Sequence, residues 1–89
     1  MNVIEKEIEV GRPDGIHARP AGELMKRMRQ FESTVELQFG DKKVDAKSII
    51  QLMSLAIKQG NVVAVRISGE DAAEALNELE LFLRGDNGL

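Results

Sequence analysis

The sequence predicts one α+β domain of 89 residues, in which a four-stranded antiparallel sheet is covered on one face by three helices. Segments with alternating apolar and polar residues, typical of half-buried strands, are interleaved with segments whose apolar residues recur every three or four positions, typical of helices. Their order is β-α-β-β-α-β-α. An open-faced sandwich is the economical architecture for that order, because the sheet and the helices each have one apolar side to bury. The length suits one domain over residues 1–89.

The first half of the chain predicts a strand, a loop, a helix and a second strand. Residues 3–10 alternate, with Ile4, Ile8 and Val10 on one face and glutamates on the other. Pro and Gly residues interrupt the pattern over 11–15 and predict a loop. A helix is predicted over 17–31, and its apolar positions are Ala21, Leu24, Met25, Met28 and Phe31. Alternation resumes at residues 35–39.

The second half predicts a hairpin, a short helix, a strand and a final helix. Gly40-Asp41 suits a two-residue hairpin loop that leads into a strand through Val44. A short helix is predicted over 48–57, with a stop at Gly60. Residues 63–67 predict the fourth strand. The last helix follows Asp71 and ends near Gly85, and its predicted buried positions are Ala72, Leu76, Leu79 and Leu83.

Composition narrows the classes of function. The formal net charge is −3 and there is no cysteine, so we expect neither a nucleic-acid partner nor a disulfide. The N-terminus lacks the basic and then apolar order of a signal peptide, and no apolar run approaches the ~20 residues of a membrane span. A cytoplasmic protein without a membrane partner is therefore expected. The chain has no GxxxxGK[ST] motif for nucleotides, and the absence of Tyr and Trp disfavours RNA stacking.

The only histidine lies in the stretch DGIHARPA, residues 14–21. Proline is tolerated in the first turn of a helix, where N–H groups have no intrahelical partner, so Pro20 predicts a helix start at 16–18. His17 is then at or beside the N-cap, and the amides of Ala18 and Arg19 point outward. Such a helix end attracts anions.

This grouping favours capture of a phosphoryl group on an imidazole nitrogen. Neutral imidazole, with a reference pKa of about 6.5, is a competent nucleophile at pH 7. The guanidinium of Arg19 matches the geometry of phosphate oxygens. Two other interpretations of His17 are a solvated polar residue and a metal ligand. One His without Cys would leave only carboxylates as further ligands, so no metal site is expected.

Two motifs resemble one known family. The segment Gly15-Ile16-His17-Ala18-Arg19-Pro20-Ala21 resembles the active-site signature of HPr, the histidine phosphocarrier family of the bacterial phosphoenolpyruvate:sugar phosphotransferase system. A second segment, residues 47–60, resembles the family's regulatory-serine helix and follows at the family's usual distance. The resemblance covers essentially the whole chain, including the order of the predicted elements.

The resemblance implies a mechanism. His17 would accept a phosphoryl group on Nδ1 from phosphorylated enzyme I and pass it to the EIIA domain of a sugar permease. Arg19 would neutralise the phosphoryl oxygens, and the amides of Ala18 and Arg19 would hold them. Gly15 and Pro20 would fix the backbone geometry. No cofactor is implied, and the protein would be a carrier with a transient phosphohistidine rather than a turnover enzyme.

The resemblance also implies docking positions on two helices. Ile49 and Met53 match the family's apolar partner surface, and Lys26 and Arg29 would form a basic rim that affects encounter rate. Core packing is the alternative for Ile49 and Met53, and an ordinary solvated face is the alternative for the two cations.

Ser48 has two interpretations. A Ser at the start of a short helix is ordinarily an N-cap worth ~1 kcal/mol. In Gram-positive members of the family, the matching serine is phosphorylated by an ATP-dependent kinase, which would make that HPr kinase and a catabolite regulator further partners. Phosphate adds roughly −1.5 to −2 charge, which would penalise enzyme I docking beside Ile49 and Met53.

Three positions depart from the family pattern: Asp14, Gly22 and Gln51. A carboxylate at Asp14 near His17 would repel the incoming phosphate and slow transfer. Gly22 would cost ~1 kcal/mol of helix propensity, and Gln51 would alter the partner-facing surface. A monomeric carrier is expected. The alternatives are a regulatory Ser48-phosphorylated binding module, a carrier of the nitrogen-related phosphotransfer branch, or a small ligand-binding domain with an incidental histidine.

Overall fold

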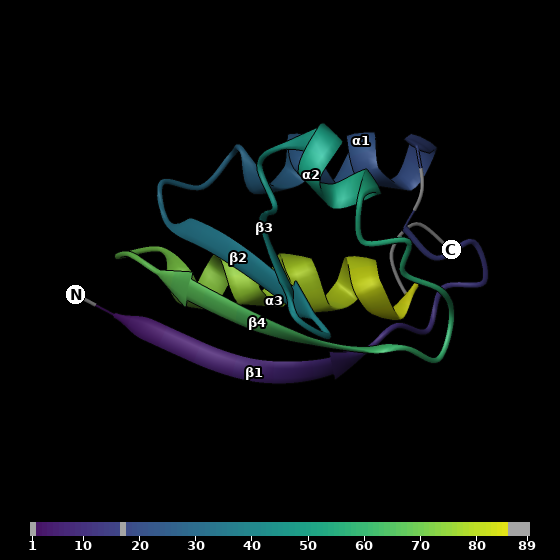
Figure 1. Ribbon diagram of the computed structural model, residues 1–89. Coiled ribbons are helices and arrows are strands. Elements are labelled where there is room, and N and C mark those ends of the chain that lie inside the picture. Colours follow the sequence, from purple (N-terminus) through teal and green to yellow (C-terminus); the bar gives the residue numbers. More distant parts are fainter. Residues whose placement is uncertain (1, 17, 86–89) are drawn as a thin grey trace.

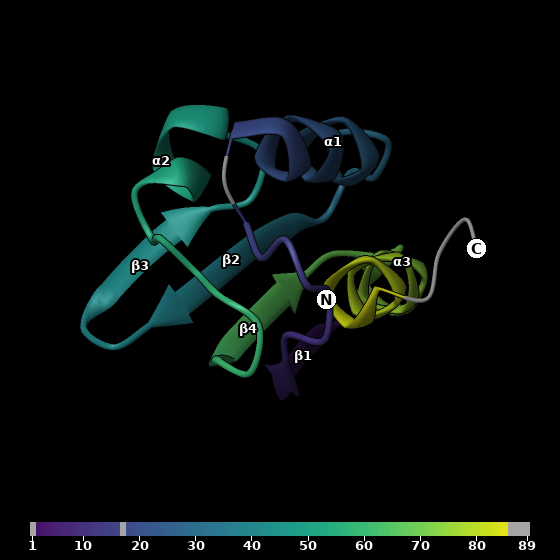
Figure 2. The ribbon, with the colours of Figure 1, turned by 90° about the vertical axis from the view of Figure 1, so that its right-hand side faces the viewer.

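The computed structural model describes residues 2–16 and 18–85, and it confirms the predicted element order (Figure 1). The strands are β1 (Val3–Glu9), β2 (Thr34–Phe39), β3 (Lys42–Asp45) and β4 (Val62–Ser68), and the helices are α1 (Ala18–Met28), α2 (Ile49–Met53) and α3 (Ala72–Arg84). The sheet order is β1-β4-β2-β3 and every pairing is antiparallel. The three helices lie on one face of this sheet (Figure 2). The predicted open-faced sandwich is therefore confirmed.

The core lies between the inner face of the sheet and the helices. On β4, Val63, Val65 and Ile67 are buried while the residues between them face outward, as the alternation predicted. The largest fully buried side chains are Phe82, Ile8, Ile16, Leu24, Met28, Leu37, Leu52, Ile67, Leu79, Leu83, Val10 and Val35. No helix among the described residues is long and apolar enough to cross a lipid bilayer.

Both predicted inner helices were too long. Helix α1 ends at Met28, after which Gln30 and Phe31 donate to carbonyls only three residues back. Helix α2 ends at Met53 because the chain is drawn away: Ala56 adopts a left-handed φ of 52°, and Ile57 forms an antiparallel bridge with Ile16. Tertiary pairing of Ile57 therefore ends the helix before its apolar pattern does.

The last helix buries a wider face than the spacing predicted. Leu76 is only partly buried, whereas Phe82, which lies outside the predicted stripe, is fully buried. Lys6 on β1 and Arg84 on α3 both donate to Glu80, over 2.7 and 2.8 Å, and their hydrogen bonds and charges lower the pKa of Glu80. The Lys6–Glu80 pair joins α3 to β1, whereas the Arg84–Glu80 pair lies within α3.

The start of α3 is tied to the turn before β2 through Asp71. Its carboxylate accepts from the Ser33 hydroxyl and from the N–H groups of Glu32 and Ser33, over 2.8 and 2.9 Å for the two N–H groups. Ser33 is the buried polar residue of the described chain. Gly69 packs directly against it, since a Cβ at Gly69 would lie 2.7 Å from the Ser33 Cα. The hydrogen bonds from Ser33 and Glu32 lower the pKa of Asp71 below its ordinary value of 3.8.

Asp71 should therefore stabilise the fold in a pH-dependent way. Because its native pKa lies below the unfolded one, the stabilisation is complete above about pH 4 and is lost as pH falls through the native pKa. We expect Asp71→Asn to lower the free energy of unfolding at pH 7, with a difference from wild type that shrinks towards pH 2.5. Urea unfolding followed by circular dichroism measures this. Glu70→Gln is the control at the neighbouring carboxylate, and a difference that stays constant with pH would contradict the prediction.

Candidate functional site

The loop before α1 is fastened to the end of α3. The Gly11 N–H donates to the carbonyl of Leu83 over 2.8 Å. A Cβ at Gly11 would lie 2.7 Å from the carbonyl oxygen of Arg84, so the two backbones approach more closely than any other residue permits. One side of the loop is thus set by contacts made some seventy residues later in the chain.

The segment 57–61 holds the other side of the loop. The Ile16 N–H donates to the Ile57 carbonyl over 2.9 Å, and the Gln59 side-chain amide donates to the Gly11 carbonyl over 3.0 Å. Gly15 has a left-handed φ of 59°, and a Cβ there would clash with the Ile57 carbonyl oxygen. The predicted geometric role of Gly15 therefore has a direct physical cause.

Helix α1 begins at Ala18, within the predicted range of starts. His17, the predicted phosphoryl acceptor, lies outside the described residues, so its role stays a prediction. Arg19 is exposed and Pro20 is buried in the first turn. The first N–H groups of a helix have no intrahelical acceptor, and this end therefore favours an anion.

Asp14 is paired with a residue that the sequence analysis did not single out. Arg12 Nε donates to Asp14 Oδ1 over 2.7 Å, and Arg12 Nη2 donates to Asp14 Oδ2 over 3.2 Å. A guanidinium and a carboxylate two residues apart in a polar loop give little sequence signal. The predicted repulsion of phosphate by Asp14 must therefore be judged together with Arg12.

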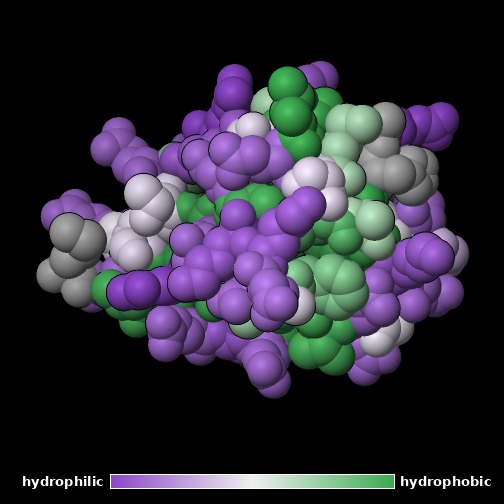
Figure 3. Space-filling model, in the orientation of Figure 1, coloured by the Kyte–Doolittle hydropathy of each residue, from purple (hydrophilic) through white to green (hydrophobic). Residues whose placement is uncertain are grey.

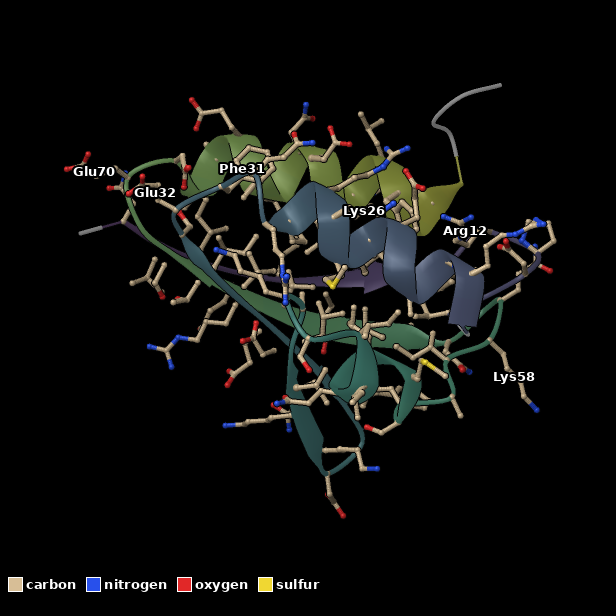
Figure 4. All side chains as sticks on the ribbon, turned by 90° about the horizontal axis from the view of Figure 1, so that it is seen from above. Arg12, Lys26, Phe31, Glu32, Lys58 and Glu70 are labelled. Atoms are coloured by element: carbon tan, nitrogen blue, oxygen red, sulfur yellow. The ribbon has the colours of Figure 1, made fainter. Side chains whose placement is uncertain are left out.

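Charged side chains of opposite sign occupy the two ends of the molecule. Arg12 and Lys58 lie at the end where α1 begins, whereas Glu32 and Glu70 lie at the far end (Figure 4). Arg12 is paired there with Asp14, so the excess positive charge at this end comes from Lys58 and from Arg19, which is exposed in the first turn of α1. This arrangement favours an anionic ligand there.

An apolar patch covers α2. Ile50 is 78% exposed and Met53 45% exposed, while Ile49 is partly buried against the core. Figure 3 shows hydrophobic surface standing over this helix at the top of the view. Met53 faces solvent as predicted, whereas Ile49 mainly packs inward. The exposed apolar surface of α2 therefore consists of Met53 and Ile50, and the sequence pattern had not indicated Ile50. Two adjacent isoleucines in a five-residue helix cannot both face the core. The sequence could therefore have predicted that one of Ile49 and Ile50 is exposed.

Ser48 and Gln51 act within α2. Ser48 is its N-cap, and the hydroxyl accepts from the Gln51 N–H over 3.4 Å, a long hydrogen bond. The Gln51 side-chain oxygen accepts from the Asp45 N–H over 2.9 Å. Gln51 therefore ties α2 to β3, a role that its departure from the family pattern did not suggest.

The contacts of α1 give a reason for glycine at position 22. They also show that the two cations of the predicted basic rim, Lys26 and Arg29, have different surroundings. A Cβ at Gly22 would lie 3.3 Å from Ile49 Cδ1, so glycine permits close packing of α1 on α2. Lys26 is exposed on α1. Arg29 Nε donates to the Lys47 carbonyl over 3.1 Å and so braces the segment before α2. Within residues 2–16 and 18–85, no three His, Cys, Asp or Glu side chains group closely enough to hold a metal ion.

Comparison with known proteins follows the same segments. A family model described as the PTS HPr component phosphorylation site matches residues 4–84. The phosphocarrier protein HPr of Xylella fastidiosa Temecula1 is 42% identical over 80 residues, covering 86% of this chain and 90% of that protein. The HPr-like protein Crh of Bacillus subtilis is 39% identical over 82 residues, covering 92% of this chain and 96% of Crh.

Solved structures show the same fold. The crystal structure of a phosphocarrier protein HPr from Bacillus anthracis has a TM-score of 0.87 and 33% identity, covering 91% of this chain and 96% of that chain. A crystal structure of B. subtilis Crh, described as a domain-swapped, intertwined dimer, has a TM-score of 0.75 and 38% identity, covering 93% of this chain and 95% of that one. The match to the family model, residues 4–84, includes the loop before α1 and α2.

Proposed function

The chain belongs to the HPr family of phosphocarriers of the phosphotransferase system, and from this premise we propose that His17 is its phosphoryl acceptor. One observation carries the proposal. The loop 11–16 is held from two sides and delivers the chain into the first turn of α1, where Arg19 is exposed. The N–H donors of the helix start and the Arg19 guanidinium thus come directly after position 17 in the chain.

The proposed step is an in-line phosphoryl transfer. The lone pair of neutral Nδ1 of His17 attacks phosphorus, a P–N bond forms, and the bond to phosphorylated enzyme I breaks with its electron pair left on the donor. The N–H groups of Ala18 and Arg19 hold the phosphoryl oxygens, and the Arg19 guanidinium balances their charge. Gly15 and Pro20 keep the loop and the first turn in place. In the second transfer a nucleophile of an EIIA domain forms the new bond to phosphorus, and the P–N bond breaks with its electron pair left on Nδ1 of His17.

Partners are proposed to dock on the apolar patch of α2. Ile50 and Met53 offer exposed apolar side chains, Ile49 supports them from below, and Lys26 adds a nearby positive charge. Arg29 is proposed as a secondary part of this rim, because its Nε is engaged with Lys47. The carrier is proposed to be a cytoplasmic monomer. Enzyme I and EIIA would then bind the same surface one after the other.

The first experiment is phosphorylation by phosphoenolpyruvate and purified enzyme I. We expect an acid-labile phosphate on the wild type and none on His17→Ala, because the P–N bond has no other site. Arg19→Gln should keep the label but form it more slowly. Equal labelling of His17→Ala would refute the assignment. An unlabelled wild type with an active enzyme I would favour the regulatory module or the nitrogen-related branch, which a cognate enzyme I of that branch would then distinguish.

Ser48 is proposed as a second, regulatory phosphorylation site. The observation in favour is its position: a half-buried N-cap hydroxyl with only a long hydrogen bond, next to the α2 patch. A kinase that adds this phosphate and a catabolite regulator that binds the phosphorylated form would be additional partners.

Ser48→Asp should raise KM for enzyme I about tenfold, since a charge beside an apolar docking surface must lose water on binding. The maximal transfer rate should change little. Steady-state transfer kinetics measure both constants. Asn77→Asp, which adds a negative charge on the exposed side of α3, is the control, and equal effects of the two substitutions would remove Ser48 from the docking surface.

A further inference from the structure

Arg12 connects three parts of the molecule that the sequence separates. Its Nε and Nη2 hold the two oxygens of Asp14, over 2.7 and 3.2 Å, and its Nη1 donates to the Phe82 carbonyl over 3.3 Å. Its guanidinium carbon lies 4.1 Å from the centre of the Phe82 ring. The guanidinium therefore joins the loop before α1 to the C-terminal turns of α3.

These contacts make Arg12 an ordered residue rather than a solvated one. Its side chain is 17% exposed, against 45% for Asp14. The Phe82 ring beneath it is fully buried, and a desolvated cation over an aromatic face is attracted more strongly than an exposed one. The two-pronged pairing of a guanidinium with a carboxylate adds a fixed direction. Arg12 thus holds the Asp14 carboxylate in one place.

The Asp14 carboxylate matters because of its place in the chain. It stands three residues before His17 and is paired with Arg12, which lies at the end where α1 begins (Figure 4). An unpaired carboxylate within a Debye length of about 8–10 Å would oppose the approach of an anionic phosphoryl group. Since Nε, Nη1 and Nη2 of Arg12 all have partners within the fold, this guanidinium is committed to the loop, and Arg19 is left to meet phosphate.

We propose that Arg12 is a positioning residue for phosphoryl transfer, which neutralises Asp14 and fastens the accepting loop to the end of α3. The inference rests on the proposed function of His17 and deepens it. It explains how this chain carries a carboxylate in the loop without losing affinity for phosphate. Arg12 acts through Asp14 and through the loop, not by contact with the phosphoryl group.

The test is a double-mutant cycle on transfer from phosphorylated enzyme I. Arg12→Met keeps an apolar chain over Phe82 and removes the guanidinium that pairs with Asp14. It should lower kcat/KM about five- to tenfold at low salt, with a smaller loss at high salt because the released charge is screened. Asp14→Asn should remain within about twofold of wild type. The double variant should recover to the rate of Asp14→Asn, since no charge is left to neutralise.

Arg27→Met is the matched control. The Arg27 guanidinium also lies over the Phe82 ring, at 5.3 Å, and it donates to Glu78 on α3 and Glu23 on α1. It should lower thermal stability without slowing transfer. A double variant as slow as Arg12→Met, or an Arg27→Met variant equally slow, would overturn the proposal in favour of a general packing role.

A second readout does not need enzyme I. Titration of the His17 ring protons by NMR should show protonation at higher pH in Arg12→Met than in wild type, and no such change in Asp14→Asn or the double variant. Unchanged titration in Arg12→Met would overturn the proposal. If the wild type accepts no phosphate, the proposed function fails, while this titration still decides whether Arg12 neutralises Asp14 at position 17.

Discussion

Gly15→Ala should destabilise the protein by about 3–4 kcal/mol and should nearly abolish phosphoryl acceptance. Two causes add. A side chain at a left-handed φ of 59° costs about 1–2 kcal/mol. The new Cβ would also clash with the Ile57 carbonyl oxygen and lie 3.1 Å from the Lys58 Cα, and both are backbone atoms. The Ile57 carbonyl cannot withdraw without losing its 2.9 Å hydrogen bond from Ile16, which sets the end of the accepting loop.

Gly40→Ala separates the two causes. Gly40 has nearly the same φ, 62°, but a Cβ there would meet nothing within 4 Å. It should therefore lose only the conformational part, about 1–2 kcal/mol, and retain normal phosphoryl transfer. Urea unfolding followed by circular dichroism is suitable, because the chain has neither Trp nor Tyr for fluorescence. Equal losses in the two variants would show that contact with Ile57 contributes nothing.

Phe82→Ala should cost about 3–5 kcal/mol of unfolding free energy. Phe82 is fully buried, and its ring supports the guanidinium groups of Arg12 and Arg27. Removing the ring leaves a cavity and removes the support of both cations. In a domain of this size, each kcal/mol corresponds to roughly 4–8 °C, so the melting temperature should fall by about 12–40 °C.

Leu81→Ala is the control for Phe82→Ala. Leu81 is the neighbouring residue of α3 and is 39% exposed, so its truncation should cost less than about 1 kcal/mol. Calorimetric melting of both variants measures the difference. Phe82→Leu should recover part of the loss by refilling the cavity, though without a ring beneath Arg12. Similar melting temperatures for Phe82→Ala and Leu81→Ala would contradict the central place given to this ring.

Local patterns predicted the sheet well and the ends of helices poorly. Alternation over 63–67 reports directly which residues face the core, so β4 was predicted correctly. The end of α2 depends instead on Ile57, which pairs with Ile16 in the motif that contains His17. Phe82 was missed because the spacing suggested a narrow stripe, whereas α3 lies against both the sheet and α1 and buries Phe82 and Leu83 together.

The candidate site divides in the same way. The chemistry of Gly and Pro in a short motif predicts the roles of Gly15 and Pro20 and the start of α1. The resemblance to the HPr family indicates what this motif does. The role of Arg12 could not be predicted from the sequence, because it depends on contacts with Phe82, seventy residues away. Ile50 needed the observed orientation of α2. Residues within one motif can thus be read locally, whereas the contacts that position the motif are long-range.

The strand order β1-β4-β2-β3 has a consequence for biosynthesis. Helix α1 and the β2–β3 hairpin are built from near neighbours and can form as they leave the ribosome. Strand β4, however, is made late and must insert between β1 and β2, and such non-local pairing is slow. The loop before α1 obtains its supports, Ile57, Gln59 and Leu83, only from this late part of the chain. A nascent chain therefore carries the phosphorylation motif long before it can present a working site, and the carrier becomes competent only when its last third has been synthesised.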